Sequence, residues 1–155
     1  MPRKFLVVVD DSPEFEAALS YATRRARSTQ GRVVLLRVIP SSSDEHWSGV
    51  REEIHRQQRA EAEALLHALG ERAAERSGAP AVFLIEEGEP QAAIRKVVGE
   101  DPEIKILVLA SGTGARGPGP LVAAILKQGA AFTGRKLPVT IVPGELTDAE
   151  IADLA

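Results

Sequence analysis

The residues with the clearest chemical potential in this chain form a glycine-rich segment, SGTGARGPGP, at positions 111–120. The segment follows the apolar run 104–110 and precedes a second apolar run at 121–126. Glycines between a strand and a helix let the backbone approach a ligand closely, and the free N–H groups that begin the helix attract negative charge. This pattern favours a phosphate or nucleotide site, with a solvated surface loop as the alternative interpretation.

The charge distribution favours an anion site in the same region. Residues 104–144 contain no Asp or Glu, and the chain as a whole has net charge −3, from 19 Lys and Arg against 22 Asp and Glu. A basic, glycine-rich window in an otherwise acidic protein is typical of a segment that binds anions. The basic side chains in the window are Lys105, Arg116, Lys127, Arg135 and Lys136. Of these, Arg116 is the expected phosphate ligand, because its planar guanidinium suits phosphate oxygens.

Two phosphate-binding motifs overlap the glycine segment but lack the required context. Gly112, Gly114 and Gly117 match the spacing of the dinucleotide fingerprint, yet they lie late in the chain and no acidic residue ends the next predicted strand. Gly112 and Gly117 also match the start of a Walker A loop, but Pro118 and Gly119 replace its Lys and Ser/Thr. We therefore expect neither an NAD site nor a P-loop.

A second group of polar side chains follows the apolar run 5–9. Asp10 lies where a buried strand would end, so its carboxylate could accept hydrogen bonds from a ribose or an adenine amine. Asp11 or Ser12 is expected to cap the following helix. The pair Asp10 and Asp11 also resembles the acidic pair of a response-regulator receiver. That interpretation fails because the third predicted strand is followed by Glu residues rather than a phospho-accepting Asp.

No catalytic or metal-binding set is evident elsewhere. His46, His55 and His67 do not have the spacing of metal ligands, and we expect all three to be solvated. Trp47 could pack at an interface or over the predicted crevice. The chain has no cysteine, which excludes disulfides, thiol catalysis and zinc–thiolate sites.

The hydrophobic pattern predicts alternating strands and helices. Strands are expected at 5–9, 33–39, 81–85, 104–110 and 139–142, and helices at 12–30, 50–76, 90–98 and 120–131, with a short helix after a capping box at 147–150. Such alternation implies parallel crossovers and a doubly wound sheet, in which ligands bind beyond the carboxyl ends of the strands where the strand order reverses. Three segments should therefore converge on one crevice, namely 10–12, 38–41 and 111–119.

Composition limits the remaining possibilities. The 155 residues predict a single domain over 1–144 with a helical tail over 145–155. The apolar run at 5–9 is too short for a signal peptide and no run approaches the length of a membrane span, so we expect a cytoplasmic protein without membrane contact. The chain is mildly acidic and has no basic–aromatic clustering, which makes nucleic acid an unexpected partner.

Several of these segments together resemble the universal stress protein (UspA-like) family. The likeness covers nearly the whole chain: Val9-Asp10-Asp11-Ser12, the strand LLRVI that ends near Val38, Gly88-Glu89-Pro90, the glycine segment, and the final PVTIVPG. The resemblance implies a five-stranded parallel α/β sheet with helices on both faces, a Rossmann-like fold of the adenine nucleotide alpha hydrolase type. It also implies a homodimer formed through the last strand, Val139–Val142, and ATP binding in one branch of the family.

The nucleotide-binding branch carries Gly-2x-Gly-9x-Gly followed by Ser or Thr, and this chain departs from that motif. Gly114 and Gly117 match the first half, but Gly129 follows after eleven residues instead of nine, and Ala130 replaces the hydroxyl residue. Carried over, Asp10 and Val38 would contact the adenine and ribose, and the three glycines would face phosphates. The complete set of predicted ligand-binding residues is Asp10, Asp11, Ser12, Val38, Ser111, Gly112, Gly114, Arg116, Gly117 and Gly129.

The resulting hypothesis is a stress-signalling module that binds ATP or another adenine nucleotide, with no metal beyond magnesium carried by the nucleotide. Its rival is a protein of the same fold that has lost nucleotide binding and acts through protein contacts. A slow ATPase is a third option, for which the sequence offers neither a general base nor a magnesium-binding set.

Overall fold

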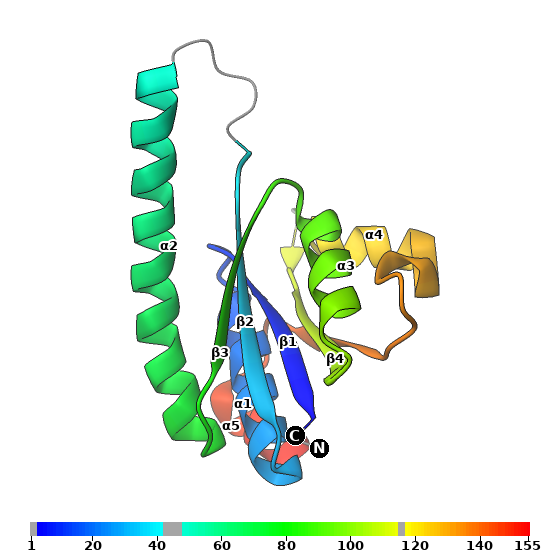
Figure 1. Ribbon diagram of the computed structural model, residues 1–155. Helices are drawn as coiled ribbons and strands as arrows, with labels where there is room; N and C mark the ends of the chain where they lie inside the picture. The colour runs from blue at the N-terminus through cyan, green and yellow to red at the C-terminus, as the bar shows by residue number, and fades with distance from the viewer. Residues whose placement is uncertain (1–2, 42–47, 115–116) are drawn as a thin grey trace.

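The computed structural model describes residues 3–41, 48–114 and 117–155, and in this part of the chain five parallel strands form one sheet of order β3-β2-β1-β4-β5 (Figure 1). The strands are β1 (Lys4–Val9), β2 (Arg32–Ile39), β3 (Val82–Glu87), β4 (Ile104–Ser111) and β5 (Val139–Pro143). The predicted five-stranded parallel α/β fold is therefore confirmed.

The strand order reverses between β1 and β4, and the helices divide accordingly between the two faces. Helices α1 (Phe15–Thr29), α2 (Ser48–Ser77) and α5 (Asp148–Leu154) cover one face, while α3 (Pro90–Glu100) and α4 (Pro120–Gln128) cover the other. Right-handed crossovers require this arrangement, because the chain proceeds outward from β1 to β3 and then in the opposite direction from β4 to β5. The carboxyl ends of β1 and β4 consequently border the switch point of the sheet.

The central strands are buried on both faces. In β1, Phe5 and Val7 belong to the core under α1 and α2, whereas Leu6 belongs to the core under α3 and α4. All three side chains are fully buried. This explains why the strand reads as a continuous apolar run instead of an alternating one.

Several element boundaries differ from the sequence prediction. Helix α1 begins at Phe15 and not at Ser12, because the backbone from Asp10 to Ser12 forms a separate turn. Helix α2 runs from Ser48 to Ser77, and β3 begins and ends later than expected. Helix α4 ends at Gln128, where Gly129 with φ 58° begins a short 3₁₀ turn, η2 (Gly129–Phe132).

The C-terminal segment packs against the body of the molecule. The predicted capping box is present, with Thr147 and Glu150 bonded reciprocally at the start of α5. Asp148 accepts hydrogen bonds from Ser20 and Arg24 of α1, and the side chain of Ile151 is buried in the same core as α1. None of the helices in the described part of the chain has the length and apolar character of a membrane span.

The histidine prediction was partly wrong. His55 is not simply solvated, since its Nε2 lies 2.7 Å from Oε1 of Glu87 and its side chain is 25% exposed. His67 is exposed and lies 3.6 Å from Glu71 on the same helix. His46 and Trp47 lie outside the described residues.

Candidate functional site

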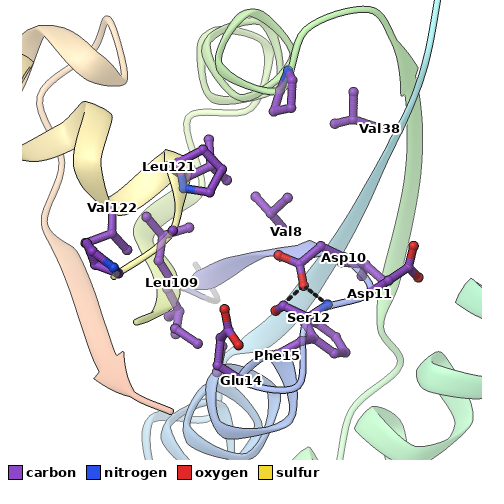
Figure 2. A pocket seen from close by; sticks show the side chains of 18 of the residues that line it. Val8, Asp10, Asp11, Ser12, Glu14, Phe15, Val38, Leu109, Leu121 and Val122 are labelled. Atoms are coloured by element: carbon purple, nitrogen blue, oxygen red, sulfur yellow. Dashed lines mark hydrogen bonds between the residues drawn. The ribbon is translucent and has the colours of Figure 1, made fainter. Parts of the chain in front are cut away.

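A pocket of about 340 Å³ lies at the switch point, as expected for a doubly wound sheet. Figure 2 shows side chains from opposite sides of the sheet reaching into it, with Val8 near the centre, Leu109 and Val122 on one side and Val38 on the other. Most of the wall is apolar, and polar groups gather where β1 leads into α1. Of the ten predicted ligand-binding residues, four line this pocket: Asp10, Asp11, Ser12 and Val38.

Asp10 is positioned by a local turn. Its Oδ1 accepts hydrogen bonds from the Ser12 backbone N–H at 2.9 Å and from the Ser12 hydroxyl at 2.5 Å. The second carboxylate oxygen points toward Val8 and the open part of the pocket (Figure 2). Ser12 therefore orients Asp10 and does not cap α1 with its side chain, which corrects the capping role expected for Ser12 or Asp11. This arrangement fixes one carboxylate edge and leaves the other available to a ligand.

Arg37 of β2 is a pocket residue that the sequence analysis missed. Its guanidinium donates to the Val9 carbonyl oxygen at 3.1 Å and lies 3.3 Å from the exposed Asp11 carboxylate. Both contacts hold the cation beside the end of β1. The signal was present in the sequence, because a charged residue interrupts the apolar run 33–39 close to its carboxyl end.

On the opposite side, the pocket is bounded by the start of α4. Pro118, Gly119 and Pro120 line it, followed by Leu121 and Val122. Gly119 precedes the helix with φ 102°, a conformation that disfavours any side chain. The N–H groups of the first turn have no intrahelical acceptor, and Pro120 contributes none, so Leu121 and Val122 supply the free donors here.

The glycine segment itself folds back on its own backbone. The Gly112 N–H donates to the Pro118 carbonyl at 3.0 Å, and the Gly117 N–H donates to the Gly114 carbonyl at 3.2 Å. Ser111 and these three glycines are not among the residues that line the pocket. Within the predicted segment 111–119, Pro118 and Gly119 line the pocket, whereas the amides of Gly112 and Gly117 have partners within the loop.

The remaining two predicted ligand-binding residues are Arg116 and Gly129. Arg116 lies outside the described residues. Gly129 follows the last residue of α4, at the other end of the helix from the pocket, so it does not line the pocket in this chain. Its eleven-residue separation from Gly117 accounts for this, because a full helix lies in between.

Among the described residues, none of the basic side chains of the window 104–144 lines the pocket. Arg135 donates to the carbonyl oxygens of Val98, Asp101 and Ile104, at the amino end of β4. Lys105 lies near the same end of the sheet. The sequence argument for an anion site was therefore incomplete, because residues close in sequence occupy opposite ends of a strand.

Glu14 is the second pocket residue that the sequence analysis missed as a ligand contact. It is half-buried and lines the pocket, and its carboxylate makes no hydrogen bond or ion pair with the described residues. Figure 2 shows its carboxylate rising from the start of α1 between Leu109 and Ser12. Acidic, histidine and cysteine side chains do not form any group of three that could hold a metal ion in the described part of the chain.

Comparison with known proteins assigns the chain to a family. The family model "Universal stress protein family" matches residues 1–124. The chain belongs to the universal stress protein family. None of the curated proteins searched matches this sequence significantly.

Solved structures of universal stress proteins share the fold at low sequence identity. UspA from Lactobacillus plantarum is 22% identical, with a TM-score of 0.72 over 90% of this chain and 97% of that one. A universal stress family protein from Arabidopsis thaliana with AMP bound is 22% identical, with a TM-score of 0.60 over 92% of each chain. The universal stress protein from Archaeoglobus fulgidus in complex with dAMP is 17% identical, with a TM-score of 0.57 over 92% of this chain and 98% of that one.

Proposed function

We propose that the pocket binds an adenine nucleotide and that the protein is a nucleotide-binding stress-response module. One observation carries the proposal: an apolar pocket at the switch point contains the Asp10 carboxylate, held through one oxygen by Ser12 with the other directed inward. Adenosine matches these features, because a flat apolar base needs apolar walls while its amine and the ribose hydroxyls donate hydrogen bonds. The AMP and dAMP complexes of the two related proteins support the same ligand class.

The distribution of groups in the pocket suggests how an adenine nucleotide would be oriented. The base and ribose would lie toward Val38 and Asp10, where apolar surface and a carboxylate oxygen are adjacent. A phosphate would lie toward the start of α4, where the N–H groups of Leu121 and Val122 are directed by the helix dipole at negative charge.

The groups that line the pocket fit a role in nucleotide binding and signalling. Slow ATP hydrolysis is a second possible activity, which a phosphate-release assay would measure. Magnesium would arrive with the nucleotide in this scheme. The family relationship favours nucleotide binding over the alternative in which the fold acts through protein contacts alone.

A homodimer through β5 belongs to the same proposal. Ile141 is 36% exposed on this strand, which pairs only with β4 in the described chain. An unpaired edge strand is a template for pairing, and a two-fold partner would satisfy its free N–H and C=O groups.

Calorimetry with a pocket-filling variant tests the binding proposal. Leu121→Trp should remove binding of AMP and ATP, because the indole would fill the pocket beside the start of α4. Leu126→Trp is the matched control, since Leu126 lies on the same helix and is 73% exposed. Absence of adenine-nucleotide binding by the wild-type protein, or equal binding by Leu121→Trp and Leu126→Trp, would contradict the proposed site.

A further inference from the structure

Glu14 has a fixed place beside the phosphate side of the pocket. A Cβ at Gly112 would lie 3.1 Å from Oε1 of Glu14, and a Cβ at Gly144 would lie 2.5 Å from Glu14 Cβ. Two glycines, at the ends of β4 and β5, therefore leave the space that the Glu14 side chain occupies. The carboxylate is packed against the beginning of the glycine segment, while it still lines the pocket.

The position is also electrostatically favourable for a carboxylate in the absence of ligand. Glu14 directly precedes α1, and the positive end of a helix dipole stabilises a negative charge there. Its carboxylate makes no hydrogen bond or ion pair with the described residues. A negative charge of the protein itself thus lies beside the pocket, near the start of α1 and the beginning of the glycine segment.

The charges that line the pocket do not balance Glu14. The charged groups that line the pocket are the carboxylates of Asp10, Asp11 and Glu14 and the guanidinium of Arg37. Arg37 is held on the β2 side by Asp11 and the Val9 carbonyl oxygen. The phosphate side of the pocket therefore carries a carboxylate whose charge no neighbouring cation among the described residues neutralises.

We propose that Glu14 is a specificity-determining residue, which makes this pocket favour adenosine and AMP over ATP when no divalent cation is present. The inference rests on the proposed function, because it assumes that an adenine nucleotide directs its phosphates toward α4. Each further phosphate adds negative charge close to Glu14, and like charges side by side in a partly desolvated pocket oppose binding. A repulsive group of this kind selects among ligands without any new attractive contact.

Calorimetry on the full-length protein in EDTA tests the inference with adenosine, AMP and ATP as probes. For the wild type, ATP should bind at least about tenfold more weakly than AMP, as like-charge repulsion requires. Glu14→Gln keeps the shape of the side chain but removes the charge, so ATP affinity should rise about tenfold while adenosine affinity stays unchanged. Mg²⁺ should narrow the difference between ATP and AMP in the wild type, because the cation neutralises part of the phosphate charge.

Glu75→Gln is the matched control for net charge. Glu75 is exposed near the end of α2, at the opposite end of the sheet, so this variant should keep the wild-type order of affinities. ATP binding that is tighter than AMP binding in EDTA, or equal responses of Glu14→Gln and Glu75→Gln, would overturn the role of Glu14 while leaving the nucleotide site intact. Failure of all three ligands to bind either protein would overturn the proposed function and this inference together.

Discussion

The two halves of the sheet that meet at the pocket present different chemistry at their carboxyl ends. On the β1–β2 side, side chains form the polar surface: Asp10 is held by Ser12, and Arg37 is held by Asp11 and the Val9 carbonyl oxygen. On the β4–β5 side, the backbone of a glycine segment folds on itself, and Glu14, which directly precedes α1, packs against it. The first side presents a carboxylate oxygen that can accept hydrogen bonds. The second side presents a loop whose described amides at Gly112 and Gly117 are already bonded.

This contrast explains why a departure in the glycine motif need not abolish binding. A ligand held mainly by its base and ribose requires the β1–β2 side, which retains the features expected of a nucleoside site. A ligand held mainly by its phosphates requires the β4–β5 side, where Gly112 and Gly117 amides are already bonded. The following changes test whether the two sides contribute in this unequal way.

The largest effect is expected at the outer edge of β5, because removing a donor there would dissociate the proposed dimer. The Leu107 N–H donates to the Pro138 carbonyl, so the alternation of a parallel strand directs the Thr140 N–H toward β4 and the Ile141 N–H outward. Ile141→Pro should therefore convert the dimer to a monomer in light scattering, and Thr140→Pro should instead break the fold of the β4–β5 half. A wild-type protein that is monomeric at micromolar concentrations would eliminate the β5 interface.

The next largest effect concerns the stability of the glycine segment. A Cβ at Gly112 would lie 2.7 Å from the Gly117 carbonyl oxygen, so Gly112→Val should destabilise the protein by about 2 kcal/mol in urea unfolding. Gly99→Ala is the control, because nothing lies within 4 Å of its added Cβ and alanine favours the α3 helix. An unchanged urea midpoint for Gly112→Val would show that the segment does not have the closed conformation described above.

A smaller effect is expected for nucleotide binding on the β1–β2 side. Asp10→Ala should weaken AMP binding at least about tenfold, or about 1.4 kcal/mol, as expected for the loss of a hydrogen bond to a charged group. Asp153→Ala is the control and should leave affinity unchanged, since Asp153 is exposed on α5 and does not line the pocket. Equal calorimetric affinities for wild type and a folded Asp10→Ala variant would remove Asp10 from the site.

The smallest effect is expected at the amino ends of the strands, away from the pocket. Burial raises the pKa of Asp101, but the hydrogen bonds from Lys4 Nζ and the Glu103 N–H outweigh it, so the pKa lies below the usual Asp value. The stability that this pair contributes is present above about pH 4 and is lost as the pH falls through the lowered pKa of the folded state. Asp101→Asn should therefore cost about 1 kcal/mol at pH 7 and less at pH 3, measured by thermal unfolding.

Nucleotide affinity provides the control for that variant, because Asp101 is remote from the pocket. Asp101→Asn should leave AMP binding unchanged. A loss of affinity comparable to that of Asp10→Ala would mean that the two ends of the sheet are coupled.

Element types were predictable from the sequence wherever local rules dominate. The apolar runs of β1 and β4 identified buried strands, and the capping box at Thr147 identified the start of α5. Boundaries were less predictable where local and tertiary interactions compete. Ser12 reads as a helix cap, yet its N–H and hydroxyl are bonded to Asp10, so α1 starts later.

Some residues of the candidate site were also predictable from the sequence, and others were not. Asp10 and Val38 were predictable because parallel strands bring their carboxyl ends together at a known place. Glu14 was not, because nothing in its local sequence specifies that its side chain reaches the pocket. Arg37 was marked only as a charge within an apolar run, and its place at the pocket depends on contacts with Val9 and Asp11. The basic window misled for a related reason: Arg135 follows Gly129 in the sequence but binds carbonyl oxygens at the far end of β4.

The sequence by itself determined the doubly wound sheet, since alternating buried strands and helices allow few other packings. It also predicted a crevice beyond the ends of β1 and β4, where the pocket lies. Only the tertiary structure decided which groups face that site. The crossing from β4 to α4 places Gly119 and Leu121 at the pocket instead of Gly129. The space left by Gly112 and Gly144 places the Glu14 carboxylate there as well. Side-chain direction at a site depends on packing between elements that are distant in sequence, and this information is absent from any local pattern.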